Sequence, residues 1–121
     1  HAPLLPGLQW QPVPAECLLA QWHFSDEERA SLEPGGALVI DAPCQRARAR
    51  SEPGAPGDLP WQLVARWDAP VALESLLGWG APLPPLPAEC LLVETAWPDA
   101  VLARGRLMPW GSGQALRIEG C

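Results

Sequence analysis

The chain has 121 residues, of which 48% are hydrophobic, and its formal net charge is −6. This content suffices for one small domain or two very small ones, and the acidic balance argues against binding to a phosphate backbone, which depends on Lys and Arg. The 16 prolines and 11 glycines leave little room for long helices, so the composition favours a mainly β fold with short helices. No apolar run approaches the length needed to span a bilayer.

The first part of the chain predicts two strands around a short helix. An apolar strand is expected over residues 17–24. Ser25 followed by acidic residues predicts a helix over residues 26–32. A Pro-Gly-Gly turn then leads into a short apolar strand over residues 37–41.

The second part repeats this order of elements. It predicts a strand, a short amphipathic helix and a further strand over residues 61–67, 71–77 and 89–94. Residues 100–119 then form the clearest hairpin in the chain, with a turn at residues 111–113 whose glycines supply positive φ angles. In its first strand, Gly105 indicates an irregularity, and Pro109 is expected at a strand end or bulge because it cannot donate to a ladder.

The elements divide the chain into two halves around a linker. Residues 8–45 form the first half, residues 46–59 the linker and residues 60–121 the second half. Residues 1–7 are expected to be a loosely held Pro-rich arm. Three alternating arginines within residues 46–50 are interpreted as part of a solvated loop and not as a groove for nucleic acid.

The four cysteines contain no CxxC pair, and only two histidines are available as nitrogen ligands, so the sequence predicts no metal site. Cys17 and Cys90 lie in apolar runs, where a reduced thiol packs as a small hydrophobe. This setting favours a reduced, cytoplasmic protein, and two disulfides in an exported protein are the alternative.

The sequence predicts no enzyme and no cofactor, because it contains no nucleophile elbow, phosphate-binding loop or dinucleotide fingerprint. His23 lies between two aromatic residues, where a packed or surface histidine outweighs a general base. The acidic residues 26–28 are adjacent and fit helix-end charges better than a paired acid and base. An enzyme with an unrecognised site would need His23 or a carboxylate to converge on a pocket.

The seven tryptophans mostly build the core, and two or three of them are expected to be exposed. Exposed Trp beside Arg is typical of protein-binding surfaces. Strand alternation in the hairpin puts its arginines and methionine on one face and Leu107 on the other. The predicted partner-binding residues are Trp79, Arg104, Arg106, Met108 and Trp110.

The order of elements and several motifs resemble the SPOA (surface presentation of antigens) domain of flagellar switch proteins and of the cytoplasmic ring proteins of type III secretion systems. The matching motifs are Leu73, Leu76 and Leu77 in the second helix and residues 102–107 and 115–118 in the hairpin. In the first half, residues 31–40 resemble the family's Leu-x-Pro-Gly-Asp followed by an apolar strand, with Gly36 in place of Asp.

The resemblance implies tandem SPOA-like halves, the first diverged or incomplete, that form an intertwined pair of small β-barrels. It also implies a non-catalytic interaction module of the cytoplasmic ring or sorting platform, at the cytoplasmic face of a secretion apparatus. Its partners would be other ring subunits and the N-terminal segment of the stator protein that regulates the export ATPase. The apolar residues and arginines of the hairpin separately predict that the partner binds there as an amphipathic helical segment. The alternative is a small exported, disulfide-bonded protein that binds carbohydrate or protein through exposed Trp.

Overall fold

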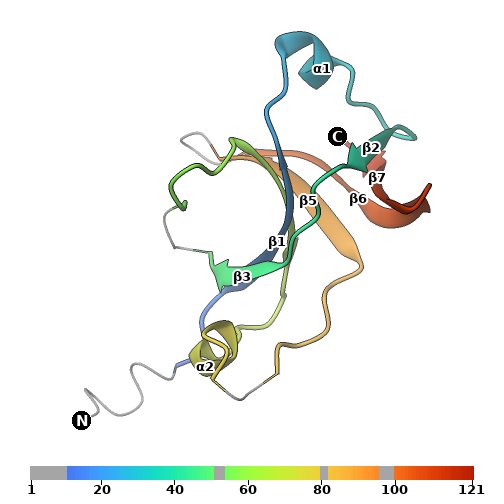
Figure 1. Cartoon of the computed structure of the whole chain (residues 1–121). Coiled ribbons are helices and arrows are strands. Elements are labelled where there is room, and N and C mark those ends of the chain that lie inside the picture. Colours follow the sequence, from blue (N-terminus) through green and yellow to red (C-terminus); the bar gives the residue numbers. More distant parts are fainter. Residues whose placement is uncertain (1–10, 51–53, 80–81, 96–99) are drawn as a thin grey trace.

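The computed structural model describes residues 11–50, 54–79, 82–95 and 100–121 (Figure 1). Within these ranges the chain forms one antiparallel sheet of seven strands and two short helices, so the predicted mainly β class is confirmed. The expected N-terminal arm and Trp97 lie outside the described residues. The strands are β1 (Ala15–Trp22), β2 (Ala37–Ile40), β3 (Arg46–Ala49), β4 (Trp61–Arg66), β5 (Glu89–Glu94), β6 (Ala100–Trp110) and β7 (Gly113–Gly120), and the helices are α1 (Asp26–Ala30) and α2 (Leu73–Leu76).

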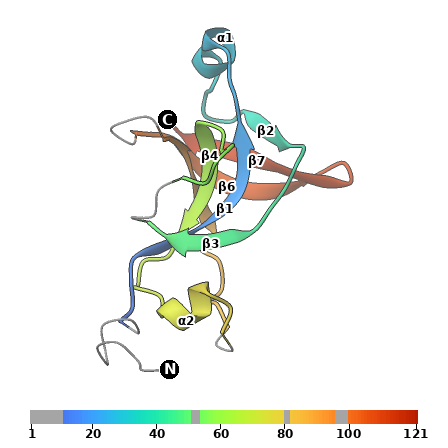
Figure 2. The ribbon, with the colours of Figure 1, turned by 60° about the vertical axis from the view of Figure 1, so that its left-hand side comes forward.

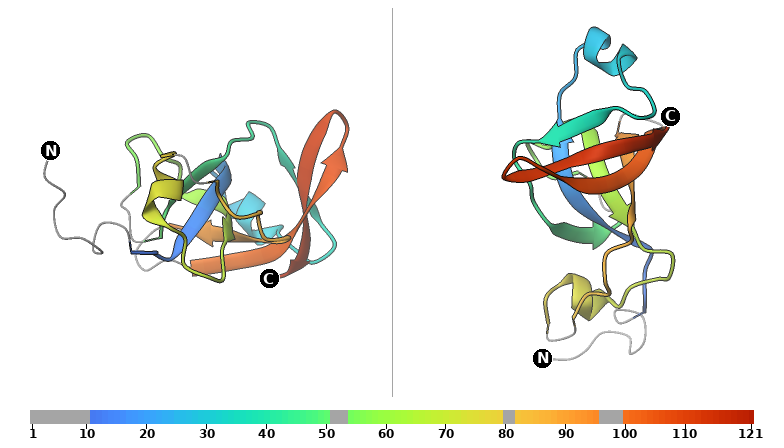
Figure 3. Two further views of the ribbon diagram at one scale, coloured as in Figure 1. Left: turned by 90° about the horizontal axis from the view of Figure 1, so that it is seen from below. Right: turned by 90° about the vertical axis from the view of Figure 1, so that its right-hand side faces the viewer.

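The sheet is strongly curled but not closed, because its two end strands do not pair with each other. The strand order is β2-β7-β6-β5-β4-β1-β3, so β2 and β3 occupy opposite ends. Only residues 41–45 connect these two strands in the sequence, and five extended residues reach about 18 Å at most. Across the gap, the indole Nε1 of Trp22 on β1 donates to the carbonyl oxygen of Val39 on β2 at 3.4 Å. Figures 2 and 3 show this curled, open arrangement from further sides.

The main core fills the concave face of the sheet. Because side chains alternate along each strand, Cys17 and Leu19 of β1 point into this core while Glu16 and Leu18 point to the convex face. The most deeply buried core side chains include Leu63, Leu92 and Leu116, from β4, β5 and β7. The convex face has a smaller apolar cluster of Leu18, Val64 and Val93, with Leu91 packed against it.

Both helices are shorter than predicted, and their ends have local causes. Ser25 caps α1, since its hydroxyl accepts the backbone N–H of Glu28 at 3.1 Å and the Glu28 carboxylate accepts the Ser25 N–H at 3.1 Å. This confirms the predicted N-cap. α2 is followed by Gly78, whose φ of 75° is left-handed, so the chain leaves the helix there.

The predicted C-terminal hairpin is confirmed as β6 and β7. Gly111 has a φ of 56°, as a two-residue hairpin turn requires at its first position, whereas Gly113, the other glycine predicted to supply a positive φ, does not have one. The ladder register shifts between Arg104 and Gly105, which is the irregularity predicted at that glycine. Pro109 is the penultimate residue of β6, near the strand end where it was expected.

The prediction of a solvated loop at the alternating arginines is wrong. Residues 46–49 form β3, which pairs with β1 through the partners Glu16 and Arg48 among others. The Arg-Ala alternation places the alanines toward the core and the arginines on the convex face. The predicted linker therefore begins with a strand, and both predicted halves contribute strands to one sheet.

Candidate functional site

The β6–β7 hairpin has two rows of apolar side chains. One row faces the core and the other faces outward. Leu107 lies opposite Leu116 and packs against the main core. Its neighbours Arg106 and Met108 point to the opposite face, and alternation places Trp110 there as well. The predicted division of this strand between two faces is thus confirmed.

The outward row continues across β7 to β2 and forms what we call the hairpin patch, composed of Val39, Met108 and Trp110. Met108 lies opposite Ala115 on β7, and Ala115 lies opposite Val39 on β2. Val39 is 38% exposed and Trp110 is 48% exposed. A hollow of about 410 Å³ opens beside them. Its lining consists of Val39, Ile40, Asp41, Pro43, Trp110, Ser112, Gly113 and Gln114.

Exposed arginines border the hairpin patch. Arg106 lies opposite Arg117 on β7, next to the Met108 row. Arg106 also makes a solvent-exposed ion pair with Glu119 at 3.3 Å, which contributes little to stability. Arg104 is exposed further along β6, where its side chain lies over Gly120. The structure thus places four of the five predicted residues on one strand, with arginines along one side of the apolar patch and the acidic Asp41 in the lining of the hollow on the other side.

Trp79 is not part of this patch. It directly follows α2, which lies at the opposite end of the molecule from the hairpin (Figure 1). The indole is 63% exposed, and the backbone N–H donates to the carbonyl oxygen of Glu74 at 2.8 Å. Trp79 was predicted as a binding residue because it lies at a turn. A turn predicts that a residue is exposed, but it does not predict which other parts of the chain lie beside it.

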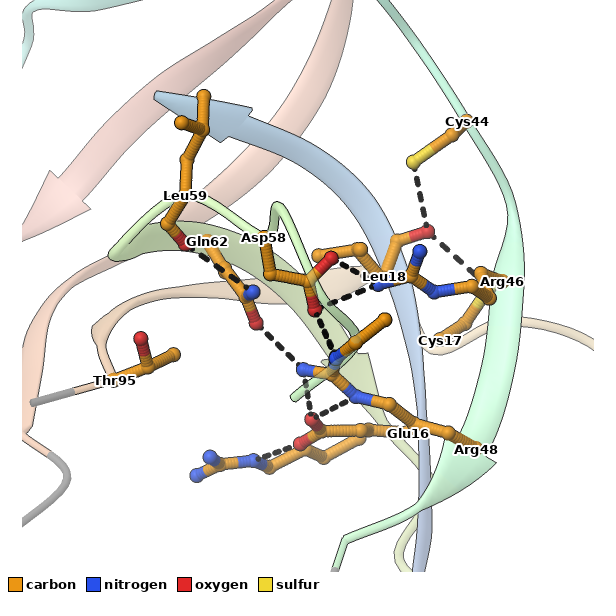
Figure 4. A network of polar contacts seen from close by, with 12 residues as sticks. Glu16, Cys17, Leu18, Cys44, Arg46, Arg48, Asp58, Leu59, Gln62 and Thr95 are labelled. Atoms are coloured by element: carbon orange, nitrogen blue, oxygen red, sulfur yellow. Dashed lines mark hydrogen bonds and ion pairs between the residues drawn. The ribbon is translucent and has the colours of Figure 1, made fainter. Parts of the chain in front are cut away.

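A polar network that the sequence analysis missed lies on the convex face of β3, β1 and β4 (Figure 4). The Glu16 carboxylate, although only 5% of the residue is exposed, accepts from two arginines on the flanking strands. Arg48 donates Nε and Nη2 to Oε2 at 3.0 and 2.8 Å, and Arg66 donates Nε to Oε1 at 3.0 Å. Arg48 Nη2 also donates to the buried Gln62 Oε1 at 2.6 Å.

Asp58, shortly before β4, extends this network. Arg46 Nη2 donates to both of its carboxylate oxygens, at 2.8 and 2.9 Å, and the Ala55 N–H donates to one of them at 3.0 Å. The hydrogen bond from Arg46 is the main reason why the pKa of Asp58 is lowered. The period-two pattern of Arg46, Arg48 and Arg50 was the sequence signal that could have indicated this face, since it is typical of a strand with one polar side.

Replacing Arg46 with glutamine is expected to raise the pKa of Asp58 toward its ordinary value, because the charged donor that favours the carboxylate is removed. Since the pKa of Asp58 is lowered in the folded state, its contribution to stability is present above the unfolded pKa and is lost as the pH falls through the folded pKa. NMR titration of the Asp58 carboxyl carbon measures the shift. An unchanged titration in the variant would contradict the assigned cause.

The four cysteines are free and fall into two environments. Cys17 and Cys90 are buried, whereas Cys44 and Cys121 are exposed. Burial is the main cause that raises the pKa of the Cys90 thiol to about 11, with the nearby Glu89 charge adding to it. Burial likewise raises the pKa of the Cys17 thiol. Because the thiolate is the reactive form, these two thiols are protected chemically as well as sterically.

We expect a thiol reagent to label two cysteines in the native protein at neutral pH and all four after denaturation without a reductant. The fast pair should be Cys44 and Cys121, and Cys44→Ser with Cys121→Ser should abolish native labelling. Mass spectrometry of the labelled peptides gives the count. An exported protein with two disulfides would instead show no reactive thiol even when denatured.

No cluster of three or more potential metal ligands occurs in the described parts of the chain. No helix within those same residues is both long and apolar enough to cross a membrane. His23 is exposed after the end of β1, and the acidic residues of α1 lie in its first turn. Comparison with models of known protein families, with curated proteins and with solved structures found no match to this chain.

Proposed function

We propose that this chain is a non-catalytic protein-interaction domain and that the hairpin patch binds an amphipathic segment of a partner protein. The observation that carries the proposal is the exposure of Val39 and Trp110 beside a hollow of about 410 Å³. Large aromatic side chains next to arginines contribute much of the binding energy in protein interfaces. A folded domain of this size has no need to expose such a group for its own core.

The arginines along one side of the patch indicate the charge of the partner at that edge. Arg106 and Arg117 lie side by side on neighbouring strands, and only Arg106 makes an ion pair within the described residues. A helical segment with an apolar face and acidic residues along its edge would complement both the patch and the arginines.

The resemblance to SPOA domains supports a more specific form of this proposal. The chain would belong to the cytoplasmic ring or sorting platform of a type III secretion system, and its partners would be the N-terminal segment of the ATPase-regulating stator protein and other ring subunits. The resemblance also supports an intertwined pair of small barrels. The outer edges of β2 and β3, which face no partner strand among the described residues, are where further pairing could close such barrels.

Replacing Trp110 with alanine is expected to weaken partner binding by about 2 kcal/mol or more, because the large aromatic anchor of the patch would be lost. The fold should be retained, since Trp110 is half exposed at the hairpin end and is not among the core residues. Isothermal titration with a synthetic stator segment measures the affinity, and circular dichroism reports the fold.

Trp79→Ala is the matched control, because this tryptophan is also exposed but lies outside the hairpin patch. Its affinity should equal that of the unmodified protein. If Trp110→Ala binds the segment as tightly as the unmodified protein, the interface lies elsewhere. If Trp110→Ala unfolds, Trp110 is a core residue. If no stator segment binds while Trp110-dependent binding of another protein is found, the secretion assignment fails and the interaction function stands.

A further inference from the structure

We propose that the hollow above the polar network on β3, β1 and β4 is a binding site for an oxyanion, the phosphate or carboxylate group of a small ligand. We call it the anion hollow. Its volume is about 400 Å³, and its basic lining residues are Arg48, Arg50 and Arg66. This region lies at the opposite end of the strand order from the hairpin patch, so the inference does not depend on the proposed interaction function.

Positive charge exceeds negative charge around the anion hollow. Its acidic lining residues are Glu16 and Asp58, against three lining arginines. Arg46 already pairs with Asp58 through two hydrogen bonds, so it joins the same charge cluster. Among the described residues, three lining guanidinium groups therefore face two lining carboxylates, an excess of one positive charge, and Arg46 lies outside the lining. Charges that are partly removed from water need a counter-charge nearby.

The existing hydrogen bonds hold two of these arginines in place without using all of their donors. Arg48 is fixed between Glu16 and Gln62, and its Nη1 lies 3.8 Å from an Asp58 oxygen, beyond hydrogen-bond distance (Figure 4). Arg66 gives only Nε to Glu16. Its terminal Nη groups have no acceptor within the residues that the structure describes, and its side chain is only 20% exposed. Donors that are pre-oriented in this way lose little entropy when they bind an oxyanion.

Arg50 supplies a third donor at the edge of the hollow. It follows β3 in the same alternation as Arg46 and Arg48, so its side chain is on the convex face. Its backbone N–H donates to Pro14 O at 2.9 Å, which fixes the backbone, while its guanidinium makes no ion pair with any described residue. Arginine donors arranged around one space are the usual way in which proteins hold phosphate and carboxylate groups.

The size of the anion hollow indicates more than a bare ion. Its volume of about 400 Å³ is far larger than the roughly 10–15 Å³ that one water needs on the same measure. Phosphate or a carboxylate would fill only part of that space. The hollow therefore has room for a small molecule that carries the anionic group at one end.

Titration of the full chain with inorganic phosphate, and separately with succinate, tests the proposal at constant ionic strength maintained with sodium chloride. The ¹H–¹⁵N resonances of the Arg48 and Arg66 side chains should shift and saturate, and the melting temperature should rise with ligand concentration. Arg50→Gln should weaken binding about tenfold, because one charge-assisted hydrogen bond is lost while no bond within the described protein is broken.

Arg117→Gln is the matched control, since it removes one exposed arginine outside the anion hollow. It should leave the titration unchanged. Preference for phosphate or for succinate identifies the class of ligand. The proposal is overturned if neither probe gives saturable shifts, or if Arg50→Gln and Arg117→Gln weaken binding equally, which would indicate general charge attraction.

Discussion

Replacing Glu16 with glutamine is expected to lower the free energy of unfolding by about 3 kcal/mol or more. The substitution keeps the shape of the side chain but removes the charge that Arg48 and Arg66 share from both sides. One of the two arginines would also face the amide NH₂ group, which cannot accept its hydrogen bond. Arg48 is 12% exposed and Arg66 is 20% exposed, so water can compensate only part of the loss.

Urea denaturation, followed by tryptophan fluorescence to which the buried Trp61 and Trp67 contribute, measures this effect as a lower midpoint with an unchanged slope. Glu119→Gln is the control, because it removes the same charge from the exposed pair with Arg106. That pair should contribute about 0.5 kcal/mol or less. If the two variants have the same midpoint, the Glu16 network does not stabilise the fold.

A third variant tests whether the loss of stability comes from unpaired buried charges or from the loss of the contacts themselves. In Glu16→Leu with Arg48→Met, Arg66→Met and Gln62→Met, the three charges and the buried amide that accepts from Arg48 are all replaced by apolar groups. Apolar replacement of a complete buried ion network is often neutral or stabilising, whereas removal of one partner is costly. We therefore expect this fourfold variant to be more stable than Glu16→Gln. A further loss of stability in the fourfold variant would show that the contacts themselves matter.

The parts of the fold that the sequence predicts are those with local causes. The α1 cap depends on Ser25 and Glu28, three residues apart, and the hairpin turn depends on Gly111. The inward faces of Leu116 and Ile118 follow from strand alternation alone. Such signals can be recognised without knowing which strands become neighbours.

The polar network could not be predicted in the same way, because long-range pairing creates it. Glu16 is 32 residues from Arg48 and 50 residues from Arg66, and only the order β3-β1-β4 brings them together. The prolines and glycines after residue 50 also made β3 look like the start of a linker. The hairpin patch was predicted in part for a similar reason. Trp110 was identified from its own strand, but Val39 joins it only because β2 pairs with β7.

The sequence indicated that β6 is irregular at Gly105, but it did not show that the backbone of β7 lies too close there for a side chain. The residue is buried in the middle of β6, opposite Ile118 on β7. A Cβ atom at this position would overlap the carbonyl oxygen of Arg117. It would also lie 2.9 Å from that carbonyl carbon and 3.2 Å from the Cα of Ile118. These are backbone atoms, which cannot turn away as a flexible side chain would.

Gly105→Ala is therefore expected to destabilise the protein by about 3 kcal/mol or more, because β6 and β7 must separate where they carry core residues. Urea denaturation measures the cost, and amide exchange at Ile118 should accelerate because the ladder is weakened there. Gly113→Ala in the same hairpin is the matched control. Its Cβ would have the Trp110 carbonyl oxygen as nearest neighbour at 4.0 Å, so its stability should stay within about 0.5 kcal/mol of the unmodified protein or rise slightly. If both variants unfold at the same urea concentration, the two strands can shift enough to accept a methyl group, and the close approach at Gly105 is not what fixes their spacing.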